Sequence, residues 1–245
     1  MTGVRSAAPA SRAPVPPTGR LVAVSERLPV FALNTVLFPG ATLPLHVFED
    51  RYRALVHHLL TISDKTLRLF AVVAIREGYE VGAHGVQSLH RVGTVAQMTS
   101  VVPHADGRFD IEVVGRSRMR LGTLDTSEPY LTGDVDVLED RPCDGAQEEV
   151  RRSLEAYTGY RRQLGELRGE DVSDSKLPGD PTYLSYTLAA TCPLPLQERQ
   201  ALLEADDARQ RLIMLRHALR EEARAMRAIP SLPATEVART GWCPN

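Results

Sequence analysis

Residues 28–53 read LPVFALNTVLFPGATLPLHVFEDRYR and contain the signals of two strands, a chain reversal and a helix start. Residues 28–33 form an almost continuous apolar run, and the Pro39-Gly40 pair that follows is typical of a turn. Residues 42–47 then alternate between aliphatic side chains and threonine, proline or histidine, which predicts a strand with one apolar face. Because Pro44 has no N–H group to donate to a ladder, we expect this strand at a sheet edge or at a bulge.

Apolar residues recur at every second position up to residue 47 and at every third or fourth position after it. Glu49 and Asp50 lie in the first turn of this repeat, where carboxylates stabilise the positive end of a helix dipole. The pattern therefore predicts a helix that begins near residue 48. Its expected buried face consists of Phe48, Tyr52, Leu55, Val56, Leu59 and Leu60.

Further strands are predicted as far as about residue 138. Residues 67–75 are apolar on both faces, so we expect this strand to be central and covered on both sides. Asp106-Gly107 lies between two alternating runs and is a strong hairpin signal. Strands are also expected in 89–102, in 109–113, in 116–121 and in 130–138. Six or seven strands with mostly local reversals favour an antiparallel, barrel-like sheet.

Helical periodicity replaces strand patterns from residue 146 onward. A long helix is expected to end near Gly169, and Asp180-Pro181 is a good cap and first-turn pair for a second helix. A third is expected over 196–204, and Asp206 or Asp207 can cap the last. The predicted organisation is a disordered leader (1–20), a β part (21–140), a helical part (146–228) and a C-terminal tail that contains Trp242 (229–245).

The composition excludes several classes of protein. With a net charge of −2 over 245 residues, the chain has no global basicity that would favour nucleic acid. Its three cysteines lie tens of residues apart, which predicts neither a disulfide framework nor a metal site. The N-terminal residues lack the apolar region that is typical of a signal peptide, and no apolar run approaches the roughly 18 residues that a membrane helix needs. We therefore expect a cytoplasmic protein without metal or cofactor.

The sequence contains no recognisable motif for the common catalytic mechanisms. The sequence contains no GxxxxGK[ST] phosphate loop, and its only lysines are Lys65 and Lys176. Lys176 lies in a polar loop beside Ser173 and Ser175, where its amine would stay solvated and protonated. The seven histidines form no metal-binding motif and are read as surface or hydrogen-bonded groups. We therefore expect that the protein is not an enzyme. The alternative is a hydrolase whose site is assembled from residues that are distant in the sequence.

Two features suggest a binding surface. Arg116, Arg118 and Arg120 are spaced by two, so on a regular strand all three guanidinium groups share one face that suits an anionic partner. The alternative is an ordinary solvated face whose arginines pair with acidic residues. Arg76 and Tyr79 belong to a glycine-containing loop, which is either a contact element for a polypeptide or a plain connection between strands.

The ordered string from residue 28 to residue 53 resembles the opening of the substrate-binding N-terminal domain of the ATP-dependent Lon proteases. The similarity continues in 75–78, 92–96, 115–120 and 196–203, and so covers roughly residues 28–228. It looks like the stand-alone bacterial members of that family. The resemblance implies an α+β fold, with a PUA-like antiparallel β pseudo-barrel that contains one early helix and is followed by a C-terminal α-helical bundle.

The resemblance also implies a function. A non-catalytic module is expected to bind unfolded polypeptides or specific client proteins, with a separate ATP-dependent protease as a further partner. The expected peptide-binding residues are Arg76, Tyr79, Arg116, Arg118 and Arg120. RNA binding is the alternative, since the PUA relation and the arginine face suggest it. A content of 5% aromatic residues leaves few side chains for base stacking, so nucleic acid is the less favoured partner.

Overall fold

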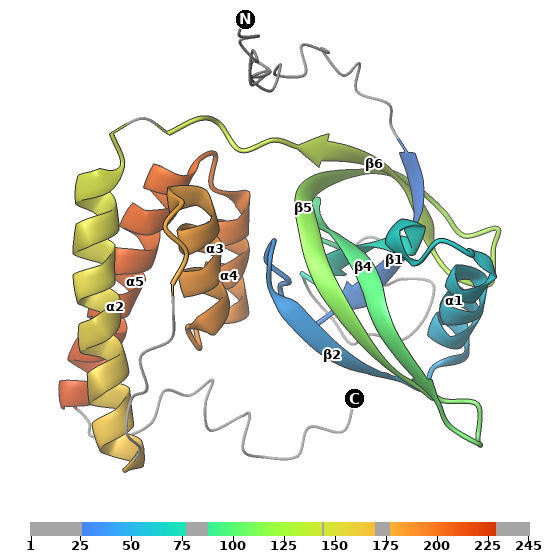
Figure 1. Cartoon of the computed structure of the whole chain (residues 1–245), viewed down its shortest axis with the longest axis horizontal. Helices are drawn as coiled ribbons and strands as arrows, with labels where there is room; N and C mark the ends of the chain where they lie inside the picture. Colours follow the sequence, from blue (N-terminus) through green and yellow to red (C-terminus); the bar gives the residue numbers. More distant parts are fainter. Residues whose placement is uncertain (1–25, 77–87, 144, 170–176, 229–245) are drawn as a thin grey trace, which may run out of the picture.

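The computed structural model describes residues 26–76, 88–143, 145–169 and 177–228, and divides them into a β half and a helical half (Figure 1). The predicted leader, the tail with Trp242 and the loop residue Tyr79 lie outside the described residues. Among the described helices, none is long and apolar enough to cross a membrane.

The β half is one strongly curved, mixed sheet. Its strands run in the order β2-β5-β4-β3-β1-β6, and β6 also pairs with β5, so the sheet curls back on itself as a pseudo-barrel. The expected α+β class is confirmed. The strands are β1 (Glu26–Leu33), β2 (Thr42–Val47), β3 (Leu69–Ala74), β4 (Val92–Pro103), β5 (Phe109–Asp125) and β6 (Thr132–Leu138).

One strand pair departs from the antiparallel prediction. β1 and β3 are parallel, with Val30 opposite Ala71 and Leu33 opposite Ala74. Parallel neighbours need a crossover connection, and β2 and helix α1 (Asp50–Thr61) supply it. Within the described residues β2 pairs only with β5, which confirms the edge position predicted from Pro44. Residues 109–121, expected as two strands, form the single strand β5.

Two apolar layers cover opposite faces of the central strands. Phe70 and Val72 of β3 pack with Tyr52 and Leu55 of α1, and the Phe31 ring stacks on Tyr52 at 3.8 Å between centroids. The alternate residues of β3 face the interior of the curled sheet. The expected burial of β3 on both faces is therefore confirmed. The sheet interior is filled by Leu28, Val30, Ala71, Val73, Val95, Met119, Leu121 and Val135.

Two apolar residues, Phe48 and Leu67, are exposed although the sequence pattern predicts that they lie on buried faces. Phe48 precedes α1 and is 38% exposed, because the chain is still extended at Glu49 and the helix begins only at Asp50. Leu67 is 59% exposed, because Lys65–Leu67 form a short 3₁₀ turn (η1) and β3 starts two residues later.

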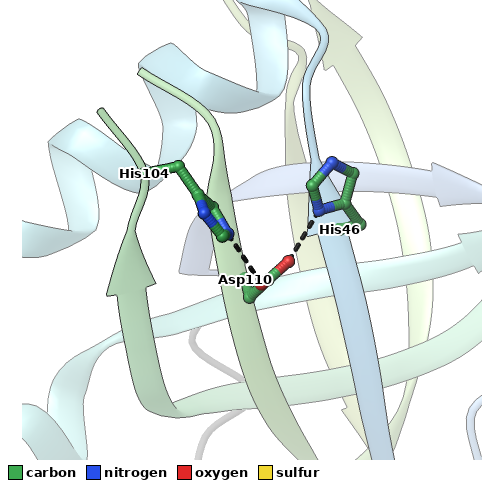
Figure 2. Close-up of side chains that lie close together, drawn as sticks. All are labelled: His46, His104 and Asp110. Atoms are coloured by element: carbon green, nitrogen blue, oxygen red, sulfur yellow. Dashed lines mark hydrogen bonds and ion pairs between the residues drawn. The ribbon is translucent and has the colours of Figure 1, made fainter. Parts of the chain in front are cut away.

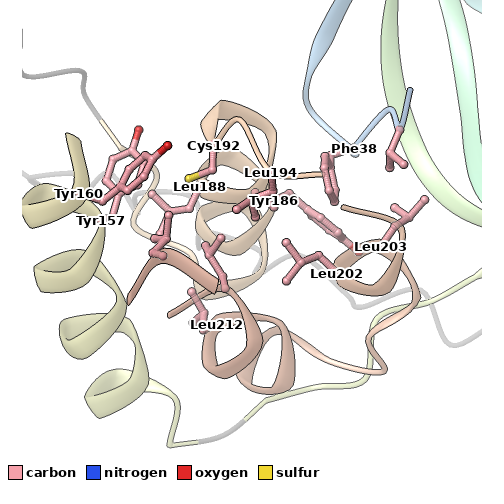
Figure 3. Close-up of a cluster of buried hydrophobic side chains, with 14 of the residues drawn as sticks. Phe38, Tyr157, Tyr160, Tyr186, Leu188, Cys192, Leu194, Leu202, Leu203 and Leu212 are labelled. Carbon is pink, nitrogen blue, oxygen red and sulfur yellow. The ribbon is translucent and has the colours of Figure 1, made fainter. Parts of the chain in front are cut away.

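The helical half consists of α2 (Gln147–Arg168), α3 (Pro181–Thr191), α4 (Leu196–Glu204) and α5 (Ala208–Ala228). The predicted ends are confirmed: Gly169 has φ +67° after α2, and the Asp180 carboxylate accepts the N–H groups of Thr182 and Tyr183 at 3.0 Å. Figure 3 shows Phe38, from the β half, entering the apolar cluster of the helices beside Tyr186. The two halves therefore share a core.

Candidate functional site

A hollow of about 340 Å³ opens at one end of the sheet interior, and we call it the barrel-end pocket. Every strand except β2 contributes to its wall. Apolar side chains from the sheet interior form its floor, and Val137, which is 60% exposed, lies at its mouth. The lining residues are Glu26, Leu28, Thr66, Leu69, Val95, Gln97, Arg116, Ser117, Val135 and Val137.

Arg116 is the one cationic side chain among these lining residues. Its Nε and Nη2 both donate to the Gln97 Oε1 atom, the former at 2.8 Å. The Gln97 Nε2 atom in turn donates to the Lys65 carbonyl at 3.1 Å. The guanidinium is thus held at the pocket wall by a neutral amide. Its charge therefore remains available to an anionic or carbonyl group of a ligand.

A β-bulge brings Arg116 to this wall. Ser117 lies opposite Val95 of β4 and Gly115 lies opposite Ala96, so Arg116 is an extra residue between two paired ones. An extra residue reverses the side on which the following residues lie. Arg116 and Ser117 accordingly both line the pocket. The two later arginines lie on the outer side of the sheet, because Met119 and Leu121 between and after them face the interior.

The structure contradicts the prediction of one exposed face carrying three arginines. Arg118 is only 4% exposed and points into the helical half. Its Nη1 donates to the carbonyl oxygens of Leu203 and Ala205, at 3.1 and 2.6 Å, and its Nη2 pairs with Asp140 at 3.1 Å. Arg118 therefore joins β5 to the end of α4 and offers nothing to a partner in solution.

Asp140 is shared by two buried arginines. Arg211 of α5, fully buried, lies 3.0 Å from the same carboxylate, and the Tyr186 hydroxyl donates to it at 2.7 Å. Burial raises the pKa of Tyr186 and lowers that of Arg211. We call Arg118, Asp140, Tyr186 and Arg211 the junction cluster. It connects the segment after β6 to three helices and so fixes the β half against the helical half.

The other predicted residues are not assembled with Arg116. Arg120 is exposed on the outer side of β5, where Asp136 of β6 lies opposite it in the ladder. Arg76 is exposed after β3, and its N–H group donates to the Ser88 carbonyl. Tyr79 lies outside the described residues. Contacts of Arg76, Tyr79 and Arg120 with a polypeptide therefore stay predictions.

Sequence reasoning did not find the apolar wall of the pocket. Leu28, Val95, Val135 and Val137 come from three strands and belong to no motif. A usable signal was the alternation in β6, where Val135 and Val137 share a face at the end of the last strand. An apolar residue at the end of an inward-facing row is a candidate for the mouth of a barrel.

A second, smaller hollow of about 210 Å³ lies along β2 and the segment after β1. Asn34, Thr35, Pro44, Phe48 and Glu49 contribute to it. Its described lining offers no arginine or lysine. Of the two hollows, the barrel-end pocket is therefore the one that combines apolar walls with a fixed cation.

Comparison with known proteins places this architecture in a family. The family model for the ATP-dependent protease La (LON) substrate-binding domain matches residues 27–221. Lon protease of Escherichia coli K12 is 29% identical over 193 residues, which are 77% of this chain and 24% of that protein. Lon protease 2 of Herpetosiphon aurantiacus is 29% identical over 203 residues, or 82% and 24% of the two chains. The chain thus spans about a quarter of the length of these relatives.

Solved structures agree with the sequence match. A Lon N-terminal domain protein from Xanthomonas campestris aligns with a TM-score of 0.54 at 25% identity, over 78% of this chain and 96% of that chain. The N-terminal domain of Mycobacterium avium complex Lon protease aligns with a TM-score of 0.58 at 17% identity, over 79% and 98%, and supports the fold alone. With a curled sheet, a helical half and a family match over 27–221, the chain belongs to the Lon substrate-binding domain family.

Proposed function

We propose that this chain binds unfolded polypeptide segments and that the barrel-end pocket receives an apolar side chain of the bound segment. The observation that carries the proposal is the combination of an apolar hollow of about 340 Å³ with a single arginine at its wall. Binding pockets are typically concave and apolar, with a few polar groups that orient the ligand. Membership of a substrate-binding family supports the same role.

Arg116 gives the pocket its second element of recognition. An extended segment carries backbone carbonyls on both sides of each side chain and, at its end, a carboxylate. A guanidinium held by Gln97 can donate to either group while the neighbouring side chain enters the pocket. The proposed interaction therefore requires an apolar side chain next to a backbone carbonyl or a terminal carboxylate. It does not require any particular sequence around that side chain.

No catalytic group is needed for this role. We further propose that bound segments pass to an ATP-dependent protease, in keeping with the name of the family and of its relatives. RNA binding is the weaker alternative, because the arginine face on which it rested is not formed once Arg118 is buried.

The test is fluorescence anisotropy with a labelled unfolded peptide that is rich in leucine and valine. A single site that must order a flexible partner is expected to bind with a Kd in the micromolar range, about −8 kcal/mol. Val137→Lys, which puts a flexible charge at the pocket mouth, is expected to weaken binding about tenfold or more. Val102→Lys is the matched control, because Val102 is also an exposed strand valine, at 54%, and lies outside the pocket.

Arg116→Gln separates the charge from the apolar contact. It is expected to lower the affinity modestly and to remove most of its salt dependence, since exposed charges are screened by salt. Arg108→Gln, in the β4–β5 hairpin, is the corresponding control.

Three results would overturn the proposal. The first is equal peptide affinity for Val137→Lys and Val102→Lys. The second is a loss caused by Phe48→Ser alone, which would move the site to the second hollow. The third is steeply salt-dependent binding of labelled single-stranded RNA without any peptide signal, because this result would favour the nucleic-acid alternative.

A further inference from the structure

Three potential metal ligands meet at the outer end of the β sheet, away from the barrel-end pocket. His46 belongs to β2, His104 follows β4 in the hairpin, and Asp110 belongs to β5 (Figure 2). His46 Nδ1 lies 2.6 Å from Asp110 Oδ1, and His104 Nε2 lies 2.7 Å from Asp110 Oδ2. The ligand atoms of the three side chains all lie within 4.8 Å of one another.

Regular backbone holds these residues in place. His46 is directly opposite Asp110 in the β2–β5 ladder. His104 is fixed by the hairpin turn, where its N–H group donates to the Arg108 carbonyl at 2.8 Å and its carbonyl accepts from Gly107 at 3.0 Å. Gly107 has φ +83°, a conformation that suits glycine and makes this tight turn possible. A site built on strands and a tight turn is better defined than one on a long loop.

We propose that His46, His104 and Asp110 form a binding site for a divalent transition-metal ion of the zinc type. Zinc takes imidazole nitrogen and carboxylate oxygen at about 2.0–2.2 Å, so two ligands of one tetrahedral ion lie about 3.4 Å apart. The present spacing reaches this value by small rotations of exposed side chains. The ion would take the place of the protons now shared between the carboxylate and the two rings.

The chemistry of the ligands selects the class of ion. Two imidazoles and one carboxylate favour zinc, copper or nickel, whereas calcium and magnesium prefer sites made of oxygen alone. All three residues are exposed, so water can complete the coordination.

One neighbouring charge opposes a cation. The Arg108 Nη1 atom lies 3.4 Å from His46 Nε2. Arg108 is itself paired with Asp106, at 2.6 Å, which offsets much of its charge. Arg108 is also exposed at the hairpin and can swing into solvent. These features fit a site of moderate affinity, with a Kd in the micromolar range.

The test is a zinc titration of untagged, chelator-treated protein by isothermal titration calorimetry. One Zn²⁺ ion is expected per chain, with no displacement by excess Ca²⁺ or Mg²⁺. His46→Gln and His104→Gln are each expected to weaken zinc binding more than about tenfold. Removing a residue that only hydrogen-bonds to a metal ligand already lowers metal affinity about 10–100-fold. His58→Gln is the matched control, because His58 is an exposed histidine of α1 outside the cluster. Far-UV circular dichroism checks that each variant is folded.

The proposal fails if the parent protein takes up no zinc at about 100 µM, or if the double variant His46→Gln/His104→Gln binds it equally well. It also fails if His58→Gln loses as much affinity as the other variants, because this would indicate general histidine binding. The readout does not depend on peptide binding, so it stands or falls separately from the function proposed above.

Discussion

Replacing Asp140 by asparagine is expected to destabilise the fold far more than its position after the last strand suggests. Asp140 is 20% exposed, yet it is the shared counter-ion of Arg118 and Arg211, which are 4% and 0% exposed. Asparagine has nearly the same shape and keeps a hydrogen-bond acceptor for Tyr186. The substitution therefore removes the negative charge and little else.

The magnitude follows from the fate of the two arginines. Both keep neutral acceptors, such as the carbonyls of Ala205 and Leu202, but neither keeps a counter-charge in the junction cluster. Removing one partner of a buried ion pair costs about 3–5 kcal/mol. Partial exposure of the carboxylate screens the pair, so we expect about 3 kcal/mol, a large share of the roughly 5–15 kcal/mol by which domains are stable.

Urea unfolding followed by far-UV circular dichroism measures this loss. The control is Asp134→Asn, because the Asp134–Arg27 pair is at the surface, with side chains 36% and 51% exposed, and such pairs contribute about 0–1 kcal/mol. In a double-mutant cycle with Arg118→Met, the double variant should lose at least about 1 kcal/mol less unfolding free energy than the sum of the two single variants. Similar unfolding free energies for Asp140→Asn and Asp134→Asn would refute the assignment of Asp140 as the counter-ion.

Two further predictions concern packing and protonation. Gly93→Ala should lower the free energy of unfolding by up to about 3 kcal/mol, since the added Cβ would collide with the Val72 carbonyl oxygen. Gly159→Ala in α2 is the control, and it should raise the free energy of unfolding by about 1 kcal/mol, because open space surrounds that position. Equal urea midpoints for the two variants would contradict this prediction. Burial lowers the pKa of His90 despite the opposing effect of Glu204, so the folded state binds this proton less tightly than the unfolded state. Its stabilising contribution is present above about pH 6.5 and is lost as the pH falls, so His90→Gln should reduce the decline in stability from about pH 7.5 to about pH 5.5.

Local sequence signals predicted the elements whose causes are local. The Asp180 cap, the Gly169 helix end and the Asp106-Gly107 hairpin each depend on the conformational preferences of a few adjacent residues. The burial of β3 followed in the same way from apolar residues on both of its faces. Each of these features could be read without knowing which strand lies next to which.

Strand partners were harder to predict, because pairing depends on distant segments. The parallel pairing of β1 with β3 contradicted a scheme of local reversals. The early helix was the available clue, since a helix between two strands is the usual crossover of a parallel pair. The assembly of His46 with His104 and Asp110 had no such clue, because it requires β2 to lie in one particular register on β5.

The arginines of β5 show why the site was only partly predicted. Regular alternation would place Arg116 beside Arg118, and a single extra residue opposite β4 separates them. A bulge is defined by two residues facing one across a pair of strands, so β5 read alone cannot reveal it. As a result, one arginine lines the proposed binding pocket while the arginine two residues later holds the helices in place. Loss of Arg116 should therefore affect binding with little change in stability, and loss of Arg118 should do the reverse.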